Sequence, residues 1–334
     1  MNGLEVSAKV AHSIAVLTSE GVTLPQTAKQ IFDELPCSVT VCTPDNAFEV
    51  LPQADALLVW DTDQHAFMEQ HWGAFDHLRW IHVAVTGVDS FMFPALKESA
   101  VTVTNAAGIY NDSIAEFVAY AVLSSAKRAR LLNAQQSSRR WSHIYSETVR
   151  GAHAVVYGVG SIGRTVGAML HALGMQVRGV DPGTAVAEGF DFIYPVSDLV
   201  EAARWADHFI ICAPLTDSTR HSIGEKIFSV MRPTCHVINV GRGPIIDEQA
   251  LIEALAAGQI GSASLDVFEH EPLDSASPLW SMPNVSISPH ISGDAGDFEM
   301  ALLRQFVNLA KRWLAGNQFL LVVDKQKGYA VRQA

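Results

Sequence analysis

The chain has 334 residues, of which 49% are hydrophobic and 17% are charged. This length indicates two domains or one large one, and the composition excludes a disordered chain, a collagen and a coiled coil. Lys and Arg number 23 against 35 Asp and Glu, which gives a net charge of −12. No nucleic acid partner is expected, because binding to phosphates needs clustered cations and the basic run Lys127–Arg130 is short.

The four cysteines, Cys37, Cys42, Cys212 and Cys235, have no CxxC spacing and no ordered histidine partners. This pattern predicts reduced, mostly buried thiols, and neither a disulfide framework nor a metal site. The first residues contain no cationic stretch followed by a long apolar one, and no apolar run is long enough to span a membrane. We therefore expect a cytoplasmic protein without a membrane partner.

Short β-branched runs alternate with helical stretches, which predicts an α/β fold with parallel sheets. Strands of the first set are expected at His12–Leu17, Ser38–Cys42, Ala56–Trp60, Leu78–Val85 and Val101–Asn105, with helices at Thr23–Leu35 and Asp61–Phe75. A long amphipathic helix is predicted at Ser113–Arg130, where apolar residues recur at helical spacing. It leads into a polar segment, Asn133–Ser146.

A second alternating set follows. Its strands are expected at His153–Tyr157, Gln176–Asp181, His208–Ala213, His236–Val240, Ala263–Phe268 and Val285–Ser288. One more helix is predicted at about Asp297–Ala315. Because the second sheet looks complete without this helix, we infer that one α/β domain is interrupted by another.

A glycine-rich turn opens the second set. The strand ending at Tyr157 is followed by Gly158, Gly160 and Gly163 in the spacing GxGxxG, and then by a helical run. A strand before this motif and a helix after it are the context of a dinucleotide-binding turn. Gly158 allows the tight turn, Gly160 lets backbone N–H groups approach a pyrophosphate, and Gly163 lets the helix pack closely. The peptides of Ser161 and Ile162, in the first helical turn, would then face the phosphates.

The next strand ends in Asp181, 18 residues after Gly163. An acidic residue at this point accepts hydrogen bonds from the ribose hydroxyls of NAD and repels the 2′-phosphate of NADP. The residues after Asp181 include no Arg, so NAD(H) is favoured over NADP(H). Arg178 lies on the same strand and is the residue that could be recruited to a phosphate.

Polar residues also follow three later strands, at the edge where open parallel sheets bind ligands. The segments are INVGRG with Arg242, LDVFEHEP with Asp266 and Glu271, and SPHISG with His290. An Arg between two glycines can form a bidentate pair with a carboxylate.

With these motifs, the chain resembles the D-isomer-specific 2-hydroxyacid dehydrogenase family. The resemblance extends from about Trp80 to Tyr329 and also includes the segments WIHVAVTGVD, VTNAAGIYNDSIAEF and CAPLTDSTRHSIG. It implies two Rossmann-like or flavodoxin-like domains, with an NAD-binding domain at 109–293 inserted into a substrate-binding domain of 1–108 and 294–334. It also implies a homodimer, with the helix Ser113–Arg130 and the segment around Trp141 in the interface.

The resemblance also implies roles for single residues. Arg242 matches the substrate-binding arginine, His290 the proton donor, and Glu271 the glutamate paired with it. Thr86 and Gly87 match the loop that holds the substrate carboxylate, and Asp266 matches the acid that contacts the nicotinamide. Further cofactor contacts are expected at Ala213, Pro214, Thr219, Val240, Gly241 and Gly293. Glu269 lies two residues from Glu271, and we choose Glu271 because it directly precedes Pro272, as the family's glutamate does.

These residue types suit hydride transfer to a 2-oxo acid. Negative charge builds on the carbonyl oxygen as the hydride arrives, so a proton must be delivered, and histidine titrates close to neutral pH. Glu271 would orient the imidazole and favour its protonated form. Arg242 would bind the carboxylate and polarise the oxo group.

The substrate is expected to be small and unphosphorylated. The loop Val59–Asp63 contains two acids, and no Lys or Arg follows it until Arg79. A phosphate would be repelled there, which favours glyoxylate or hydroxypyruvate, with Trp60 as a candidate pocket wall. Three alternatives stay open: a phosphoglycerate dehydrogenase-type activity, a dehydrogenase for another acid such as phosphite, and an NADH-sensing binding protein, similar to corepressors, with little turnover.

Overall fold

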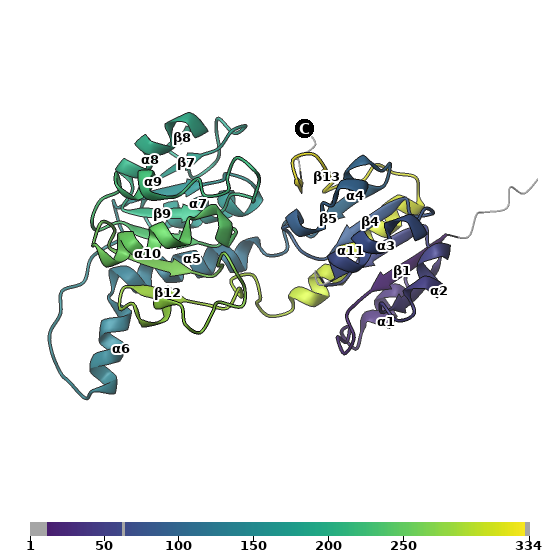
Figure 1. The fold of residues 1–334 in the computed structure, drawn as a ribbon, viewed down its shortest axis with the longest axis horizontal. Coiled ribbons are helices and arrows are strands. Elements are labelled where there is room, and N and C mark those ends of the chain that lie inside the picture. The colour runs from purple at the N-terminus through teal and green to yellow at the C-terminus, as the bar shows by residue number, and fades with distance from the viewer. Residues whose placement is uncertain (1–11, 62–63, 331–334) are drawn as a thin grey trace, which may run out of the picture. The chain divides into compact units, whose positions relative to one another are not determined.

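The computed structural model describes residues 12–61 and 64–330. They form two compact units, here called the terminal unit (Met1–Ile109 with Asp297–Ala334) and the inserted unit (Tyr110–Gly296). The boundaries expected from the sequence, 109 and 293, lie close to this division. Two parallel α/β sheets, one interrupted by the other, confirm the fold class predicted from the alternating strands and helices (Figure 1).

The terminal unit is a five-stranded sheet with helices on both faces. Its elements are β1 (Ser13–Leu17), α1 (Ala28–Phe32), β2 (Ser38–Cys42), α2 (Ala47–Val50), β3 (Ala56–Val59), α3 (His65–His71), β4 (Trp80–Val83), α4 (Pro94–Glu98), β5 (Thr102–Asn105), α11 (Phe298–Leu314), β13 (Val323–Asp324) and β14 (Tyr329–Ala330). The strand order is β2-β1-β3-β4-β5, and all neighbours in this sheet are parallel. This is the order of flavodoxin-like sheets.

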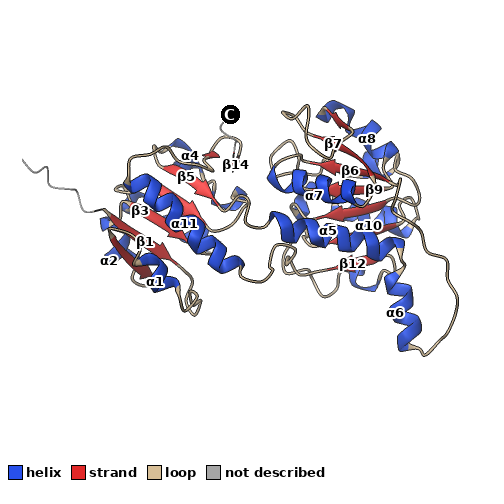
Figure 2. Ribbon diagram, turned by 180° about the vertical axis from the view of Figure 1, so that it is seen from behind, coloured by secondary structure: helices blue, strands red, loops and turns tan. Residues whose placement is uncertain are grey.

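Helix α11 returns the chain to the terminal unit and lies across its sheet (Figure 2). Phe306 of α11 stacks on Trp80 of β4, with ring centroids 5.3 Å apart, and meets Phe32 of α1 edge-on. All three side chains are buried. The apolar face of α11 therefore packs into the core of the terminal sheet.

The inserted unit is a seven-stranded parallel sheet. Its elements are α5 (Asn111–Ala126), α6 (Ala129–Ser137), β6 (His153–Tyr157), α7 (Ser161–Ala172), β7 (Gln176–Val180), β8 (Phe192–Tyr194), α8 (Leu199–Trp205), β9 (His208–Ile211), α9 (Glu225–Phe228), β10 (His236–Asn239), α10 (Glu248–Ala256), β11 (Ser262–Leu265) and β12 (Val285–Ile287). The order β12-β11-β10-β9-β6-β7-β8 reverses direction between β6 and β9. Ligands bind at such switch points in doubly wound sheets.

Alternation along the central strand explains the two layers of helices. Val155 and Tyr157 of β6 belong to the core under α8, α9 and α10, whereas Ala154 and Val156 belong to the core under α5 and α7. Successive side chains of a strand point to opposite faces, so a strand buried on both sides reads as one apolar run.

The structure departs from the sequence prediction at four places. The helix expected at Ser113–Arg130 ends at Ala126, and α6 begins at Ala129, because Arg128 has a left-handed backbone with φ of 53°. Strand β8 was not expected, and the helix predicted at Thr23–Leu35 is reduced to α1. Residues 62–63 of the helix predicted at Asp61–Phe75 lie outside the described residues, and within that range α3 covers His65–His71.

All four cysteines are free thiols, and burial raises the pKa of Cys42 to about 11 and those of Cys212 and Cys235 to about 12. In the described part of the chain, no helix is both long and apolar enough to cross a membrane.

Candidate active site

The turn between β6 and α7 is shaped by its three glycines. Gly158 has φ of 94°, and a Cβ atom there would lie 2.6 Å from the backbone of Ala213. A Cβ at Gly163 would lie 1.9 Å from the Gly158 oxygen. Nothing lies within 4 Å of the Cβ position at Gly160, which is the N-cap of α7. Two glycines thus allow close packing, and the third leaves the positive end of a 12-residue helix open to an anion.

Asp181 follows β7 and faces the same turn. Its carboxylate accepts hydrogen bonds from the Val159 N–H at 2.9 Å and from the peptides of Gly183 and Thr184 at 2.9 and 2.8 Å. A carboxylate has about four acceptor positions, so three bonds leave room for one more donor. The glycine turn and this acid fit the pyrophosphate and adenosine ribose of a dinucleotide.

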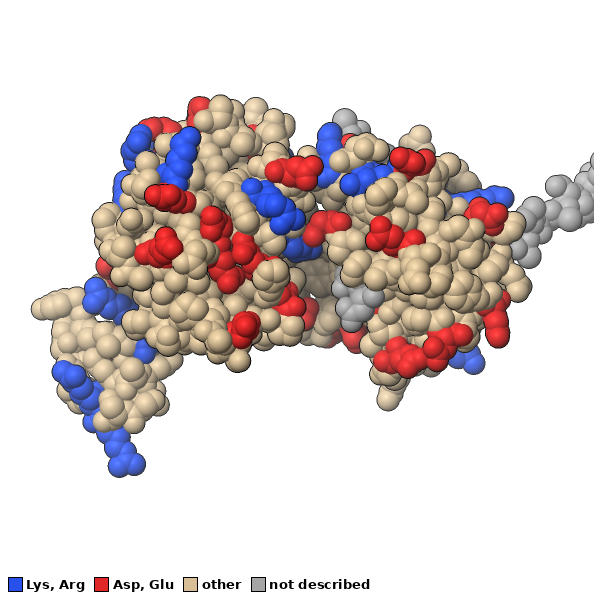
Figure 3. Space-filling view, in the orientation of Figure 1, with Lys and Arg blue, Asp and Glu red and all other residues tan. Residues whose placement is uncertain are grey.

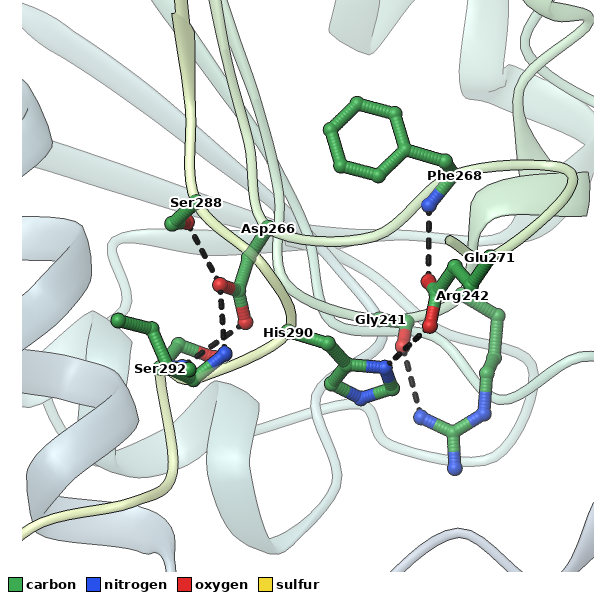
Figure 4. A network of polar contacts seen from close by, with 9 residues as sticks. Gly241, Arg242, Asp266, Phe268, Glu271, Ser288, His290 and Ser292 are labelled. Carbon is green, nitrogen blue, oxygen red and sulfur yellow. Dashed lines mark hydrogen bonds and ion pairs between the residues drawn. The ribbon is translucent and has the colours of Figure 1, made fainter. Parts of the chain in front are cut away.

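His290 and Glu271 form a close pair. His290 Nδ1 lies 2.7 Å from Glu271 Oε2, and Glu271 Oε1 accepts a hydrogen bond from the Phe268 N–H at 3.0 Å (Figure 4). His290 has φ of 55°, a left-handed conformation that histidine rarely adopts. Because Nδ1 is held by Glu271, Nε2 is the ring nitrogen left for a substrate. The sequence choice of Glu271 over Glu269 agrees with this geometry.

The pairing shifts the pKa values of both His290 and Glu271. The hydrogen bond to Glu271 raises the pKa of His290, against an opposing effect of burial, and the Glu271 charge raises it further. Burial acts to raise the pKa of Glu271, but hydrogen bonds from His290 and from the Phe268 peptide outweigh it, so that this pKa is lowered. The pairing therefore stabilises the charged forms of both groups, imidazolium beside carboxylate.

Arg242 lies in the turn after β10. Asn239 Nδ2 donates to the Arg242 carbonyl at 3.0 Å, and the Gly241 N–H donates to Asn239 Oδ1 at 3.1 Å. Arg242 Nη1 donates to the Gly241 carbonyl at 2.8 Å. Its charge acts on both His290 and Glu271. In Figure 4 the guanidinium and the imidazole extend to the same side of the loops that carry them.

Asp266 is fully buried and holds the segment that carries His290. Its Oδ1 accepts from Ser288 Oγ at 2.6 Å and from the Ile291 N–H at 2.9 Å, and its Oδ2 accepts from the Ser292 N–H at 2.9 Å. The His290 N–H donates to the Asp266 carbonyl at 2.9 Å. Sequence reasoning assigned Asp266 a nicotinamide contact, and this bracing of residues 288–292 was not foreseen.

Comparison with known proteins identifies the family. Residues 119–292 match the model of the D-isomer specific 2-hydroxyacid dehydrogenase, NAD binding domain. The chain belongs to the D-isomer-specific 2-hydroxyacid dehydrogenase family. The resemblance found in the sequence motifs is thereby confirmed, and the chain is an oxidoreductase that acts on the CH–OH group of hydroxy acids.

Three relatives place the chain within the family. Glyoxylate/hydroxypyruvate reductase B of Enterobacter agglomerans is 30% identical over 76% of this chain and 82% of its own length. D-3-phosphoglycerate dehydrogenase of Methanocaldococcus jannaschii is 34% identical over 64% of this chain and 41% of its own. A dehydrogenase of this family from Xanthobacter autotrophicus, solved with NADPH and MES, superimposes with a TM-score of 0.82 at 28% identity, covering 96% of this chain and all of that one.

Two of the loops expected to line the cofactor in this family, those after β9 and β10, are in contact. Ala213 and Pro214 follow β9, and a Cβ at Gly241 would lie 2.9 Å from the Ala213 carbonyl oxygen. Thr219 Oγ1 donates to the Pro214 carbonyl at 2.7 Å, which closes the loop after β9. Val240, directly before Gly241, is buried, and a Cβ at Gly293 would lie 2.9 Å from the Tyr110 ring.

Apart from Arg242, the expected substrate-binding residues lie in the terminal unit. Thr86 and Gly87 follow β4 at its carboxyl end, where Asn105 Nδ2 donates to the Thr86 carbonyl at 2.5 Å. Trp60 follows β3 and is only 8% exposed, so most of its ring belongs to the core. Asp61 accepts hydrogen bonds from the Ser19 N–H and hydroxyl, both at 2.7 Å. The roles of Thr86, Gly87 and Trp60 toward a substrate stay predictions.

Sequence reasoning missed one polar contact beside the site. Glu269 pairs with His221, whose Nε2 lies 2.5 Å from Glu269 Oε1. The sequence gives no signal for this pairing, because His221 and Glu269 are 48 positions apart. No group of three or more His, Cys, Asp or Glu in residues 12–61 and 64–330 is arranged to hold a metal ion.

Proposed function

We propose that the chain is an NAD(H)-dependent reductase of small, unphosphorylated 2-oxo acids, with glyoxylate or hydroxypyruvate as substrate. The observation that carries the proposal is the pairing of Glu271 with His290, at 2.7 Å, beside Arg242. A cation for a carboxylate and a protonated histidine for a developing alkoxide are what reduction of a 2-oxo acid requires.

The nicotinamide cofactor supplies the hydride when it is bound. Arg242 binds the carboxylate of the oxo acid and polarises its carbonyl group. His290 delivers a proton from Nε2 to the carbonyl oxygen, while Nδ1–H stays bonded to Glu271 and the carboxylate stabilises the imidazolium until transfer. In the reverse direction, neutral His290 removes the hydroxyl proton, and Glu271 then favours the charged product.

Preference for NAD(H) over NADP(H) rests on Asp181 at the end of β7. Arg178, the cation that could have been recruited to a 2′-phosphate, is engaged elsewhere: it donates to Tyr194 Oη at 2.6 Å and lies 4.0 Å above the Trp205 ring. NADPH in the Xanthobacter relative is the reason to test this preference directly.

The double variant Asp181→Ser with Pro182→Arg tests the cofactor proposal. It removes the carboxylate that repels a 2′-phosphate and adds a cation to pair with it, so the preference for NADH is expected to narrow or reverse. The measurement is kcat/KM for both cofactors at saturating oxo acid. Equal values for NADH and NADPH in the wild type would contradict the proposed role of Asp181.

A small unphosphorylated substrate fits the charge of the loop after β3. Asp61 is anchored there by Ser19, so its carboxylate keeps a fixed place at the end of the strand. A phosphate near a fixed anion would be repelled. Glyoxylate and hydroxypyruvate, named in the Enterobacter relative, carry only one carboxylate and no phosphate.

Initial rates with a panel of oxo acids test the substrate. Glyoxylate, hydroxypyruvate, pyruvate and phosphohydroxypyruvate would each be offered with NADH and with NADPH, followed at the nicotinamide absorbance. Higher kcat/KM for glyoxylate or hydroxypyruvate than for phosphohydroxypyruvate is expected. The phosphoglycerate dehydrogenase relative makes phosphohydroxypyruvate the second candidate, and a preference for it would replace the proposal. Tight NADH binding without turnover of any oxo acid would instead support an NADH sensor.

The protein is further proposed to be a homodimer, joined through α6 and the segment after it. None of the α6 side chains is buried, and Leu131, Leu132 and Trp141 are exposed. The five cations between Lys127 and Arg140 have no acid among them, in a chain of net charge −12. Figure 3 shows blue side chains on α6 and red ones over the face with α10. A second copy of the chain offers both an apolar face and the opposite charge.

A further inference from the structure

A second histidine–carboxylate pair lies in the inserted unit, next to the candidate active site. His221 Nε2 is 2.5 Å from Glu269 Oε1, and these side chains are 49% and 27% exposed. His221 belongs to the loop after β9, and Glu269 to the loop after β11 that also carries Glu271. The pair therefore joins two loops that end different strands of the sheet.

The backbone of His221 reaches a third loop, the one that carries Arg242. The His221 N–H donates to the Pro244 carbonyl at 2.8 Å, and Ile223 forms a parallel bridge with Ile246. His221 itself has φ of 50°, a left-handed conformation that few non-glycine residues adopt. In this conformation the peptide faces the Arg242 turn while the ring reaches Glu269.

The Arg242 turn and the Glu271 loop are in direct backbone contact. A Cβ atom at Gly243 would lie 1.8 Å from the carbonyl carbon of Phe268, so nothing larger than glycine fits between them. On the Glu271 side, the Glu269 N–H donates to Glu248 Oε2 at 3.2 Å. Glu269 lies two positions before Glu271. Its peptide is thus bonded to Glu248 of α10, and its side chain to His221.

We propose that His221 is a positioning residue, which holds the Arg242 turn with its peptide and the Glu271 loop through Glu269. It keeps Glu271 where its carboxylate meets His290 Nδ1. The consequence for turnover rests on the proposed function, but the consequence for the His290 titration does not. The charged groups that act on His290 are Glu271, Arg242 and Asp266. Glu269 faces His221, and Glu248 at the start of α10 accepts from the Glu269 peptide.

The first test is the titration of His290, followed by the NMR signals of the histidine rings in the whole chain. His221→Asn removes the ring and keeps a residue that tolerates positive φ, and Glu269→Gln removes the charge at the other end. Each variant is expected to lower the titration midpoint of His290 by about 0.5 pH, because Glu271 is then less firmly placed against the imidazole. His221→Lys again places a side-chain N–H donor toward Glu269, so this variant is expected to recover part of the change.

The second test is kinetic. Both variants are expected to lower kcat/KM for the oxo acid about tenfold, with the dissociation constant of NADH within about twofold of wild type. His153→Asn is the matched control, because His153 also pairs with a carboxylate, Asp207 at 3.3 Å, but at the amino end of β6. That variant is expected to keep the wild-type His290 midpoint and kcat/KM.

An unchanged His290 midpoint in His221→Asn and Glu269→Gln would overturn the proposal, as would a change in thermal midpoint alone. If His221→Asn does not fold, Glu269→Gln decides the question, because it alters no backbone preference. If the wild type reduces none of the oxo acids, the proposed function fails, whereas the titration still decides whether His221 positions Glu271.

Discussion

Three side chains on three separate loops of the inserted unit carry the proposed chemistry. Arg242 lies in a turn braced by Asn239, Glu271 accepts from the Phe268 peptide, and His290 is carried by a segment fixed to buried Asp266. Each of these residues is therefore held in place by a hydrogen bond from a neighbouring residue or segment. Groups held in this way need little reorganisation as charge develops.

Arg242→Ala is expected to lower kcat/KM for oxo acids by at least a factor corresponding to about 3 kcal/mol, because the bidentate anchor for the carboxylate is lost. The dissociation constant of NADH is expected to change little. Arg242→Lys, which keeps the charge but not the planar fork, is the control. Its kcat/KM should lie between those of the wild type and Arg242→Ala. Wild-type turnover of Arg242→Ala would mean that the carboxylate is held by other groups, such as the peptides of Thr86 and Gly87.

The pairing of Glu271 with His290 predicts in which direction the pH dependence of turnover moves when Glu271 is replaced. In Glu271→Gln the charge that raises the pKa of His290 is gone, so this pKa falls. Reduction needs protonated His290, so the alkaline limb of its pH–kcat profile should move to lower pH. Oxidation of the hydroxy acid needs neutral His290, so its acidic limb should move the same way.

Replacing the histidine itself gives the reference for this measurement. His290→Ala is expected to lose about 10²–10⁴ in kcat for reduction, the usual range for a positioned general acid, and Glu271→Gln should lose less. A Glu271→Gln profile that superimposes on wild type in both directions would show that the pair at 2.7 Å does not set the titration of His290.

At the scale of elements, the glycine turn packs closely between β6 and α7. Two of the glycines are needed for packing, since the Cβ positions at Gly158 and Gly163 overlap backbone atoms. Gly160 is different, because the space at its Cβ position is open. A single motif thus contains two glycines that close packing requires and one whose proposed role is toward the ligand, and substitution can separate these roles.

Gly160→Ala is expected to keep the thermal midpoint near wild type and to weaken NADH binding at least about tenfold, since a methyl group would stand where a pyrophosphate approaches. Gly163→Ala should instead lose about 1–3 kcal/mol of unfolding free energy, because its methyl group meets the Gly158 oxygen. Gly73→Ala, in the terminal unit and also in open space, is the control for the Gly-to-Ala change. NADH titration by fluorescence, with thermal unfolding of each variant, measures both effects.

At the scale of the whole molecule, α6 and the residues after it project from the rest of the inserted unit (Figures 1 and 2). The apolar side chains of Leu131, Leu132 and Trp141 in this segment are exposed. The sequence predicted one helix from Ser113 to Arg130, but the left-handed residue Arg128 turns the chain away after α5. Exposed Leu131, Leu132 and Trp141 cost free energy in water unless another surface covers them.

Sedimentation velocity tests the proposed dimer. The double variant Leu132→Ser with Trp141→Ser should raise the dimer dissociation constant at least about tenfold, or about 1.4 kcal/mol, because it removes two apolar anchors. Trp280→Ser is the control, since Trp280 is also exposed but lies on a different segment of the inserted unit. A wild-type chain that sediments as a monomer at micromolar concentration would contradict the proposal.

The sequence by itself determined the α/β class, the interrupted order of the two units, the glycine turn and the three residues proposed for the chemistry. These features depend on local rules: side-chain alternation along strands, the need for glycine where the backbone approaches closely, and short motifs in a defined order. The tertiary structure decided how closely Glu271 meets His290, where the helix after Tyr110 breaks, and that α11 packs on Trp80. The pairing of His221 with Glu269 also belongs to this second group. Such contacts join residues tens of positions apart, and they depend on the register of neighbouring strands and the left-handed turns that follow them, which no local pattern encodes.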